Sequence, residues 1–233
     1  MNVPASIGLI IPSSNRLTEP QFNAYAPAGV GIHTTRLRMT GKFRKPLSEL
    51  KRALTEAAEA LSDVKPGIIV FHCTANSMEA GLAHEKAVVE IIAQASGCPT
   101  ITTAQALTQA FNHFDIKRLV LISPYVKETN QLEVNYLTET GYTVLRELGL
   151  GLDTHGYSIV TPEEWRNIVK ETARPDADGY FLSCTNTRMI EAIEDLERDL
   201  NKPVISSNQA TLWACLKQLG IKHSNKKLGR LFD

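Results

Sequence analysis

The chain lacks the charge excess and the apolar spans that mark nucleic-acid or membrane proteins. Its 233 residues carry 25 basic and 25 acidic side chains, so the formal net charge is zero. The one basic cluster, from Lys222 to Arg230, is interpreted as a solvated tail rather than a nucleic-acid patch. No apolar stretch approaches the roughly 20 residues of a membrane span, and no basic leader precedes the first apolar run. We therefore expect a cytoplasmic protein with no nucleic-acid and no membrane partner.

Motifs for metals and nucleotides are missing as well. The four cysteines form no Cys-x-x-Cys pair and have no zinc-finger spacing. No Walker motif, Gly-x-Gly-x-x-Gly or His-Glu-x-x-His sequence is present. We expect no metal and no cofactor, and free thiols in a reducing compartment. The hydrophobic content of 43% is ordinary for a globular protein that buries a core without disulfides.

The sequence does contain an approximate internal duplication. Residues 67–76 read GIIVFHCTAN, and residues 179–187 read GYFLSCTNT. A second pair follows, PTITTAQA at 99–106 and PVISSNQA at 203–210. Each apolar run is typical of a buried parallel strand. Cys73 and Cys184 stand at matching places in the two halves, which predicts two thiols facing one cleft.

Apolar strands alternate with amphipathic helices along the whole chain, which predicts an α/β fold. We expect two pseudo-symmetric lobes, each a roughly four-stranded parallel sheet flanked by helices, with the site in the cleft between them. The lobes are predicted at residues 1–115 and 116–215, with the tail 216–233 packing back on the first lobe. Strands are expected near residues 7–11, 30–37, 68–71, 99–101, 119–122, 143–148, 180–182 and 204–205, and helices near residues 47–61, 80–95, 104–114, 127–140, 162–174, 188–200 and 208–219.

A thiol at the end of a strand and just before a helix is expected to have a lowered pKa, because helix N-termini carry partial positive charge. The alternative is that Cys73 and Cys184 are small core residues. Their matching positions favour the functional interpretation. Cys98 and Cys215 lack such a setting and are interpreted as core residues. His72 points to the opposite face of its strand from Cys73, so a packed or solvated histidine is favoured over a Cys–His pair.

Polar side chains follow most of the predicted strands, where ligands bind parallel sheets. They could hold a carboxylate through hydroxyl, amide and backbone N–H groups, or they could cap helices and form turns. Capping is the favoured role for most of the segments 102–103 and 206–208, while Tyr125 could present its phenol to an oxyanion. His155 and Arg188 are weaker site candidates, with a solvent-exposed side chain as the default. The polar segments are Ser13–Asn15, Thr74, Thr102–Thr103, Thr185 and Ser206–Asn208.

These motifs together resemble the aspartate/glutamate racemase superfamily, and within it the branch of maleate cis-trans isomerases and arylmalonate decarboxylases. The resemblance covers nearly the whole chain and rests on the segments 12–15, 73–74, 102–104, 123–125, 183–185 and 203–209. It implies two lobes with a cofactor-free site between them, and a homodimer or higher homo-oligomer. It also implies that Cys73 and Cys184 act as a thiol/thiolate pair on a small carboxylate.

The branch offers more than one reaction. In its isomerases, the thiolate matching Cys73 adds to the double bond and the thiol matching Cys184 protonates the neighbouring carbon. Its decarboxylases keep only the cysteine matching Cys184, so Cys73 counts against a plain decarboxylase. The resemblance implies that Asn15 and Tyr125 match substrate-contacting positions of the isomerases. We expect further substrate contacts at Ser14, Thr74, Ala75, Asn76, Thr185 and Asn186.

Three departures from the isomerase pattern bear on the substrate. The run 74–77 after Cys73 is polar and closer to the decarboxylases, the run 153–155 lacks an expected asparagine, and residues 184–186 differ from the second isomerase motif. The leading hypothesis is isomerisation of a maleate-like substrate. The alternatives are an amino-acid racemase of the aspartate/glutamate type, an arylmalonate-type decarboxylase, and a non-catalytic protein that binds a small ligand in its cleft.

Overall fold

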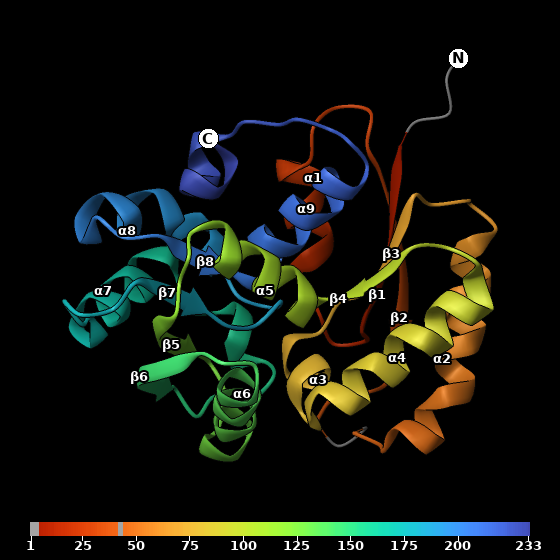
Figure 1. Ribbon diagram of the computed structural model, residues 1–233, viewed down its shortest axis with the longest axis horizontal. Helices are drawn as coiled ribbons and strands as arrows, with labels where there is room; N and C mark the ends of the chain where they lie inside the picture. The colour runs from red at the N-terminus through yellow and green to blue at the C-terminus, as the bar shows by residue number, and fades with distance from the viewer. Residues whose placement is uncertain (1–4, 42–43) are drawn as a thin grey trace.

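A computed structural model describes residues 5–41 and 44–233 as two parallel sheets of four strands each, flanked by helices (Figure 1). The strand orders are β2-β1-β3-β4 and β6-β5-β7-β8, so the second half repeats the topology of the first. This confirms the predicted α/β fold. The strands are β1 Ser6–Pro12, β2 Gly31–Leu37, β3 Ile68–Phe71, β4 Thr100–Thr102, β5 Arg118–Ser123, β6 Thr143–Gly149, β7 Gly179–Leu182 and β8 Val204–Ser206.

Helices connect successive strands, and most lie close to the predicted ranges. The predicted helix at 188–200 is divided into a short 3₁₀ segment, η3, followed by α8. Helices α1 and α3 were not predicted. The helices are α1 Thr18–Tyr25, α2 Leu47–Ser62, α3 Thr74–Met78, α4 Gly81–Ser96, α5 Thr103–His113, α6 Lys127–Glu139, α7 Pro162–Thr172, α8 Ile193–Leu200 and α9 Ser207–Gln218, with 3₁₀ segments η2 Gly156–Ser158, η3 Met189–Ala192 and η4 Lys226–Phe232.

The central strands of both sheets are buried on both faces. Every residue of β1, β3 and β7 is buried, whereas the edge strands β2 and β6 are partly exposed. This is the pattern of parallel sheets with helices on each face, where a strand reads as a continuous apolar run rather than as an alternation. It explains why the four-residue runs at 68–71 and 179–182 could be recognised from the sequence.

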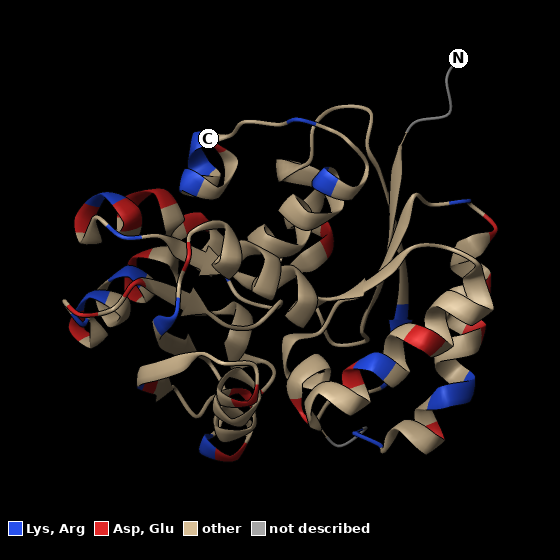
Figure 2. Ribbon diagram, in the orientation of Figure 1, with Lys and Arg blue, Asp and Glu red and all other residues tan. Residues whose placement is uncertain are grey.

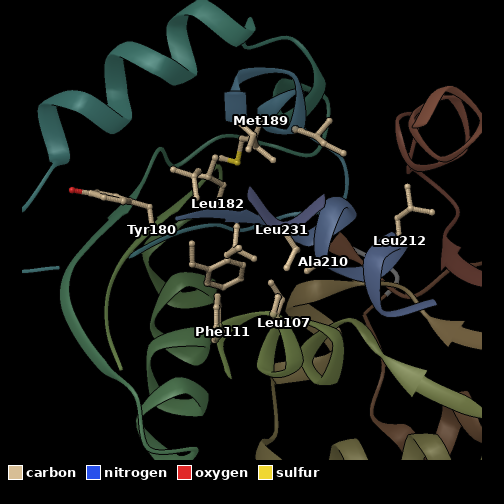
Figure 3. Packing of buried hydrophobic residues seen from close by; sticks show 14 of the residues in the cluster. Leu107, Phe111, Tyr180, Leu182, Met189, Ala210, Leu212 and Leu231 are labelled. Carbon is tan, nitrogen blue, oxygen red and sulfur yellow. The ribbon is translucent and has the colours of Figure 1, made fainter. Parts of the chain in front are cut away.

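One hydrophobic core joins the two halves of the chain. Helices α5 and α9 lie side by side at the centre of the molecule, between the two sheets (Figure 1). Phe111 of α5 packs edge-on against Phe181 of β7 and Tyr142, with ring centroids 5.5 and 5.3 Å apart. Figure 3 shows Leu107 and Phe111 facing this shared core. A second, smaller cluster lies between the first sheet and helices α2 and α4.

The placement of charge follows from this arrangement. Lys, Arg, Asp and Glu lie mainly on the outer helices, while α5 carries none of them (Figure 2). A helix covered on most sides has no water to solvate a charge, so its polar residues are amides and hydroxyls. The division into lobes at residue 115 stays a prediction. None of the helices within residues 5–41 and 44–233 has the length and apolar character needed to cross a bilayer.

Two equivalent helices begin with the same capping box, as the sequence predicted for these segments. The hydroxyl of Thr102 accepts the N–H of Gln105, whose side chain accepts the N–H of Thr102. Ser206 and Gln209 make the same reciprocal pair at the start of α9. Each cap satisfies two backbone N–H donors that the helix leaves unpaired. The caps fix the point where β4 and β8 turn into helices.

The interpretation of residues 222–230 as a solvated tail is wrong at Leu228. The packing of the tail 216–233 on the first lobe stays a prediction. The lysines are exposed, but Leu228, Leu231 and Phe232 are buried, and η4 packs chiefly against α8. The side chain of Gln209 donates to the carbonyl of Leu228 at 2.6 Å. The apolar residues determine that this segment packs on the protein, because the free energy gained by burying them outweighs the entropic cost of ordering a short segment.

This docking predicts a clear difference between neighbouring substitutions. Leu228→Ala should lower the free energy of unfolding by about 2–5 kcal/mol, because Leu228 is fully buried. Lys227→Ala, at the exposed position beside it, should change it by less than about 0.5 kcal/mol. Urea unfolding followed by circular dichroism measures both. Equal effects of the two substitutions would show that the segment is not docked in solution.

Candidate active site

The carboxyl ends of the strands from both halves meet at one cavity of about 400 Å³. It is lined by residues that follow β1, β3, β5 and β7, together with the loops after β2 and β6. Nine of the ten predicted site residues line it, and Thr74 does not. The nine are Ser14, Asn15, Cys73, Ala75, Asn76, Tyr125, Cys184, Thr185 and Asn186.

Cys73 lies between β3 and the five-residue helix α3, and is the N-cap of that helix. Its side chain is buried, and its thiol donates to Oδ1 of Asn76 at 3.0 Å. The amide nitrogen of Asn76 donates to the carbonyl of Met39 at 3.1 Å, and lies 3.4 Å from the carboxylate of Glu79. Asn76 therefore fixes the orientation of the Cys73 thiol, and its own side chain is held by a hydrogen bond to Met39 in the loop after β2.

Cys184 has a strained backbone. Its φ is +118°, whereas the three other described non-glycine residues with positive φ lie at 50–53°, in the ordinary left-handed region. Such conformations cost roughly 1–3 kcal/mol and persist only where the surroundings impose them. Here Ser207 Oγ accepts the Cys184 N–H at 3.2 Å, and the hydroxyl of Thr187 donates to its carbonyl at 3.3 Å.

Burial raises the pKa of both thiols, that of Cys184 to about 12. The hydroxyl of Tyr125 and the N–H of Asn186, 3.3 Å from the Cys184 sulfur, offset part of this rise. The predicted lowering of the two pKa values is therefore wrong. The reason is that loss of water around a buried thiolate outweighs the partial charge of a short helix end. Within residues 5–41 and 44–233, no lysine or arginine lowers the pKa of either thiol.

Thr74 occupies a different position from the one expected. Its hydroxyl donates to Ser207 Oγ at 2.8 Å, and the same oxygen accepts the N–H of Cys184. The hydroxyl is thus used between the halves of the chain rather than in the cavity. Thr74, beside the first cysteine, helps to hold the backbone of the second.

Asn15 lines the cavity and also joins the two halves. Its amide nitrogen donates to the carbonyl and the hydroxyl of Thr185, at 3.2 and 3.0 Å. Its Oδ1 accepts the N–H groups of Leu17 and Thr18, so it caps the start of α1 as well. Of the two roles that the sequence left open for this segment, bonding to backbone N–H groups is present at Asn15, and carboxylate binding stays a prediction.

His72 is a packed histidine, as the sequence favoured. It is fully buried, and its two ring nitrogens lie 3.0 Å from Thr103 Oγ1 and 2.9 Å from Asn208 Oδ1. Burial lowers the pKa of His72 to about 4, so the ring is neutral at pH 7. Asn208 also donates to Gln21 of α1, at 2.5 Å. His72 therefore belongs to the polar contact between the halves.

The weaker candidates lie outside the cavity lining. His155 is exposed, with Nδ1 2.5 Å from Arg16 Nη2, and Arg188 pairs with Glu191 at 2.6 Å. Cys215 is fully buried as expected, whereas Cys98 is only partly buried. All four cysteines are free. Within residues 5–41 and 44–233, no group of three or more His, Cys, Asp or Glu is placed to hold a metal ion.

Several lining residues were not predicted. They come from the segments after β2 and β6, from the end of α3 and from α6. The ring of Tyr157 packs edge-on against Tyr125 with centroids 5.5 Å apart. The parallel topology alone places the loop after every strand at this edge, so the loops could have been included. Their individual residues carry no motif. They include Met39, Thr40, Arg44, Glu79, Leu132, Asp153, Thr154 and Tyr157.

Comparison with known proteins agrees with this geometry. The model of the arylmalonate decarboxylase family matches residues 3–232, and the chain belongs to that family. It is 28% identical over 230 residues to a maleate isomerase of Pseudomonas putida, covering 93% of this chain and 92% of that protein. It is 28% identical over 242 residues to a maleate isomerase of Geobacillus stearothermophilus, covering 97% and 96%.

The fold agrees with that of a solved relative. A mutant of the Nocardia farcinica maleate cis-trans isomerase, with a covalently bound succinylcysteine intermediate, superposes with a TM-score of 0.88. The match covers 98% of each chain at 22% sequence identity. The two-sheet architecture is therefore retained although most residues differ.

The strain at Cys184 predicts that glycine at this position is more stabilising than alanine, the reverse of the usual order. Cys184→Gly should be more stable than Cys184→Ala by about 1 kcal/mol. Relief of roughly 1–3 kcal/mol of strain exceeds the roughly 0.5–1 kcal/mol entropic cost of glycine. Urea unfolding of both variants measures the difference.

Cys73 is the matched control, because its φ of −152° suits any residue. Cys73→Gly should be no more stable than Cys73→Ala. If glycine were the less stable choice at both positions, the backbone at Cys184 would not be strained in solution.

Proposed function

We propose that this protein catalyses the cis–trans isomerisation of a small unsaturated dicarboxylate of the maleate class, without a cofactor. The observation that carries the proposal is that Cys73 and Cys184, which come from different halves of the chain, line the same cavity. The succinylcysteine in the Nocardia relative supports covalent chemistry at one of two such thiols.

The proposed reaction begins with a Cys73 thiolate and a Cys184 thiol. The thiolate adds to one carbon of the double bond, and Cys184 delivers its proton to the other carbon, which leaves a succinyl thioether and a Cys184 thiolate. Rotation about the new single bond follows. The Cys184 thiolate then removes a proton from the carbon that was protonated, the C–S bond breaks, and the trans product leaves with the Cys73 thiolate restored.

Negative charge develops on one substrate carboxylate during the addition, so the site must supply hydrogen-bond donors. Tyr125 is buried in the cavity wall, and its hydroxyl lies close enough to interact with the Cys184 sulfur. The N–H groups of Ala75 and Asn76 belong to the first turn of α3, where helical N–H groups have no partner within the helix. We assign these groups, with Asn15, Ser14, Thr185 and Asn186, to carboxylate binding.

Decarboxylation of an arylmalonate is the second candidate. The polar run 74–77 after Cys73 favours it, and the matching family model carries that name. A decarboxylase needs one thiol to protonate the carbanion and could tolerate loss of Cys73. The second thiol in the cavity favours isomerisation. Homo-oligomeric assembly and a cytoplasmic location stay predictions.

Proton NMR in deuterium oxide separates the reactions. Maleate should give fumarate, while aspartate, glutamate and hydantoins should show no α-deuterium exchange and phenylmalonate no loss of carbon dioxide. Cys73→Ser should lower the rate by roughly 10⁴-fold or more, as removal of a nucleophile does. Cys184→Ser should lower it by about 10²–10⁴-fold, as loss of a general acid does.

Cys98→Ser is the control, because Cys98 is free, partly buried and outside the cavity lining. It should leave the rate unchanged. Turnover of phenylmalonate that survives Cys73→Ala, without turnover of maleate, would replace isomerisation by decarboxylation. Reaction of none of the substrates would reject the enzymatic proposal.

Tyr125→Phe should lower kcat for maleate by about 10²–10³-fold, because it removes one preorganised donor to the developing charge. Tyr142→Phe is its control. Tyr142 is largely buried, its hydroxyl lies 3.5 Å from Asn112 Oδ1, and it does not line the cavity. Steady-state kinetics at pH 7 measure both. Equal losses for the two variants would show that packing, and not the Tyr125 hydroxyl, is responsible.

A further inference from the structure

Glu133 is a carboxyl group buried behind the cavity that the proposed reaction does not use. It lies on α6 with no exposed surface. Its Oε1 accepts the hydroxyl of Ser183 at 2.8 Å, and its Oε2 is buried with no hydrogen-bond partner. No ion pair to it is present in the described part of the chain. An ionised carboxylate left in this state is costly, whereas a protonated one carries no net charge to desolvate.

The position of Glu133 links it to the second cysteine. Asn130 and Glu133 lie one turn apart on the buried face of α6, and each accepts a hydrogen bond from a serine at the end of a neighbouring strand. Asn130 Oδ1 accepts the hydroxyl of Ser123 at the end of β5, at 2.6 Å, and Glu133 accepts that of Ser183 just after β7. Ser123 Oγ also accepts the N–H of Tyr125, and Ser183 directly precedes Cys184. Helix α6 therefore fixes the backbone beside both Tyr125 and Cys184.

In the described part of the chain, burial and the Ser183 hydrogen bond set the pKa of Glu133, and no lysine, arginine or histidine contributes to it. A negative charge on Glu133 raises the pKa of the two thiols and of two phenols in the cavity wall. One turn away on either side, Asn130 donates to Glu147 of β6 and Tyr136 donates to Glu85 of α4. Helix α3, which contacts α6, contains no titratable residue. The thiols and phenols are Cys73, Cys184, Tyr125 and Tyr157.

We propose that Glu133 is a positioning residue that works as an uncharged acid: it holds the Ser183–Cys184 segment, and by keeping its proton it leaves the two cysteines able to form a thiolate. The part that concerns isomerisation rests on the proposed function, while the effect on the thiols does not. A permanent carboxylate at this place would oppose the thiolate in every step. A purely apolar residue would leave the Ser183 hydroxyl without its acceptor.

The sign of the pH dependence follows from burial. Desolvation raises the pKa of Glu133 to about 8, and the hydrogen bond from Ser183 offsets part of the rise. Glu133 is therefore protonated at pH 7 and ionises only as the pH passes about 8. Below that pH, Glu133 adds no charge that opposes thiolate formation. Above it, the new charge disfavours the thiolate, so the rate should rise less steeply with pH than thiol ionisation by itself requires.

The experiment compares the wild-type protein with Glu133→Gln, which has nearly the same shape, keeps an acceptor for Ser183 and cannot ionise. Iodoacetamide alkylation of Cys184 is followed by peptide mass spectrometry as a function of pH. At about pH 6, where Glu133 is protonated, the two proteins should react at equal rates. At about pH 9.5, Glu133→Gln should react about tenfold faster, since one neighbouring like charge shifts a pKa by about one unit.

Glu85→Gln is the matched control, because Glu85 is also a buried glutamate and is bonded to Tyr136 and Thr102 away from the cavity lining. It should match the wild type at both pH values. The same ratio of Glu133→Gln to wild type at both pH values would overturn the proposal, because a merely structural role would not depend on pH.

A direct measurement on the wild-type protein covers the case in which Glu133→Gln does not fold. The infrared carbonyl band of a protonated carboxyl, with carbon-13 glutamate to identify it, should disappear as the pH passes about 8. Its loss by about pH 5 would overturn the proposal. Both measurements need no substrate, so failure of maleate turnover would reject the isomerase proposal without touching this one. With maleate, the kcat of Glu133→Gln should rise more steeply above about pH 8 than that of the wild type.

Discussion

The structure depends on polar contacts that hold the carboxyl ends of two separate sheets against each other. Asn15 bonds Thr185, Thr74 reaches Cys184 through Ser207, and His72 bonds Asn208. These side chains are buried, so each must find a partner, and each finds it on the other half of the chain. The apolar contact of α5 with α9 brings the two halves together but, being non-directional, does not fix their relative orientation. The hydrogen bonds set their register, and the register places both thiols in one cavity.

Burial at this junction has opposite consequences for stability and chemistry. It raises the pKa of both thiols and of Glu133, and it surrounds Cys184 with contacts that impose an unfavourable φ. In water these groups would ionise near their usual pH values and the backbone would relax. Enclosure keeps them neutral, so a thiolate forms at a cost and gains reactivity by having little solvation to lose. The same enclosure makes hydrogen-bond donors such as Tyr125 effective.

Much of the fold was predictable because its signals are local. Runs such as 68–71 and 179–182 identify buried parallel strands, and capping boxes at Thr102 and Ser206 mark helix starts. The repeated Cys-Thr pair identified the strand ends that matter. The predictions that failed are those that depend on which groups surround a residue in the folded protein. The thiol pKa values were predicted in the wrong direction, the interpretation of residues 222–230 as a solvated run failed at the buried Leu228, and Glu133 was not singled out.

The sequence by itself determined the order of strands and helices, the duplication and the two cysteines, because these depend on side-chain type and spacing along the chain. Only the tertiary structure decided which groups meet. Contacts between distant segments make the Thr74 hydroxyl bond Ser207 and place Glu133 against Ser183, beside Cys184. A pKa or a backbone strain is set by the neighbours in space, which no local pattern specifies.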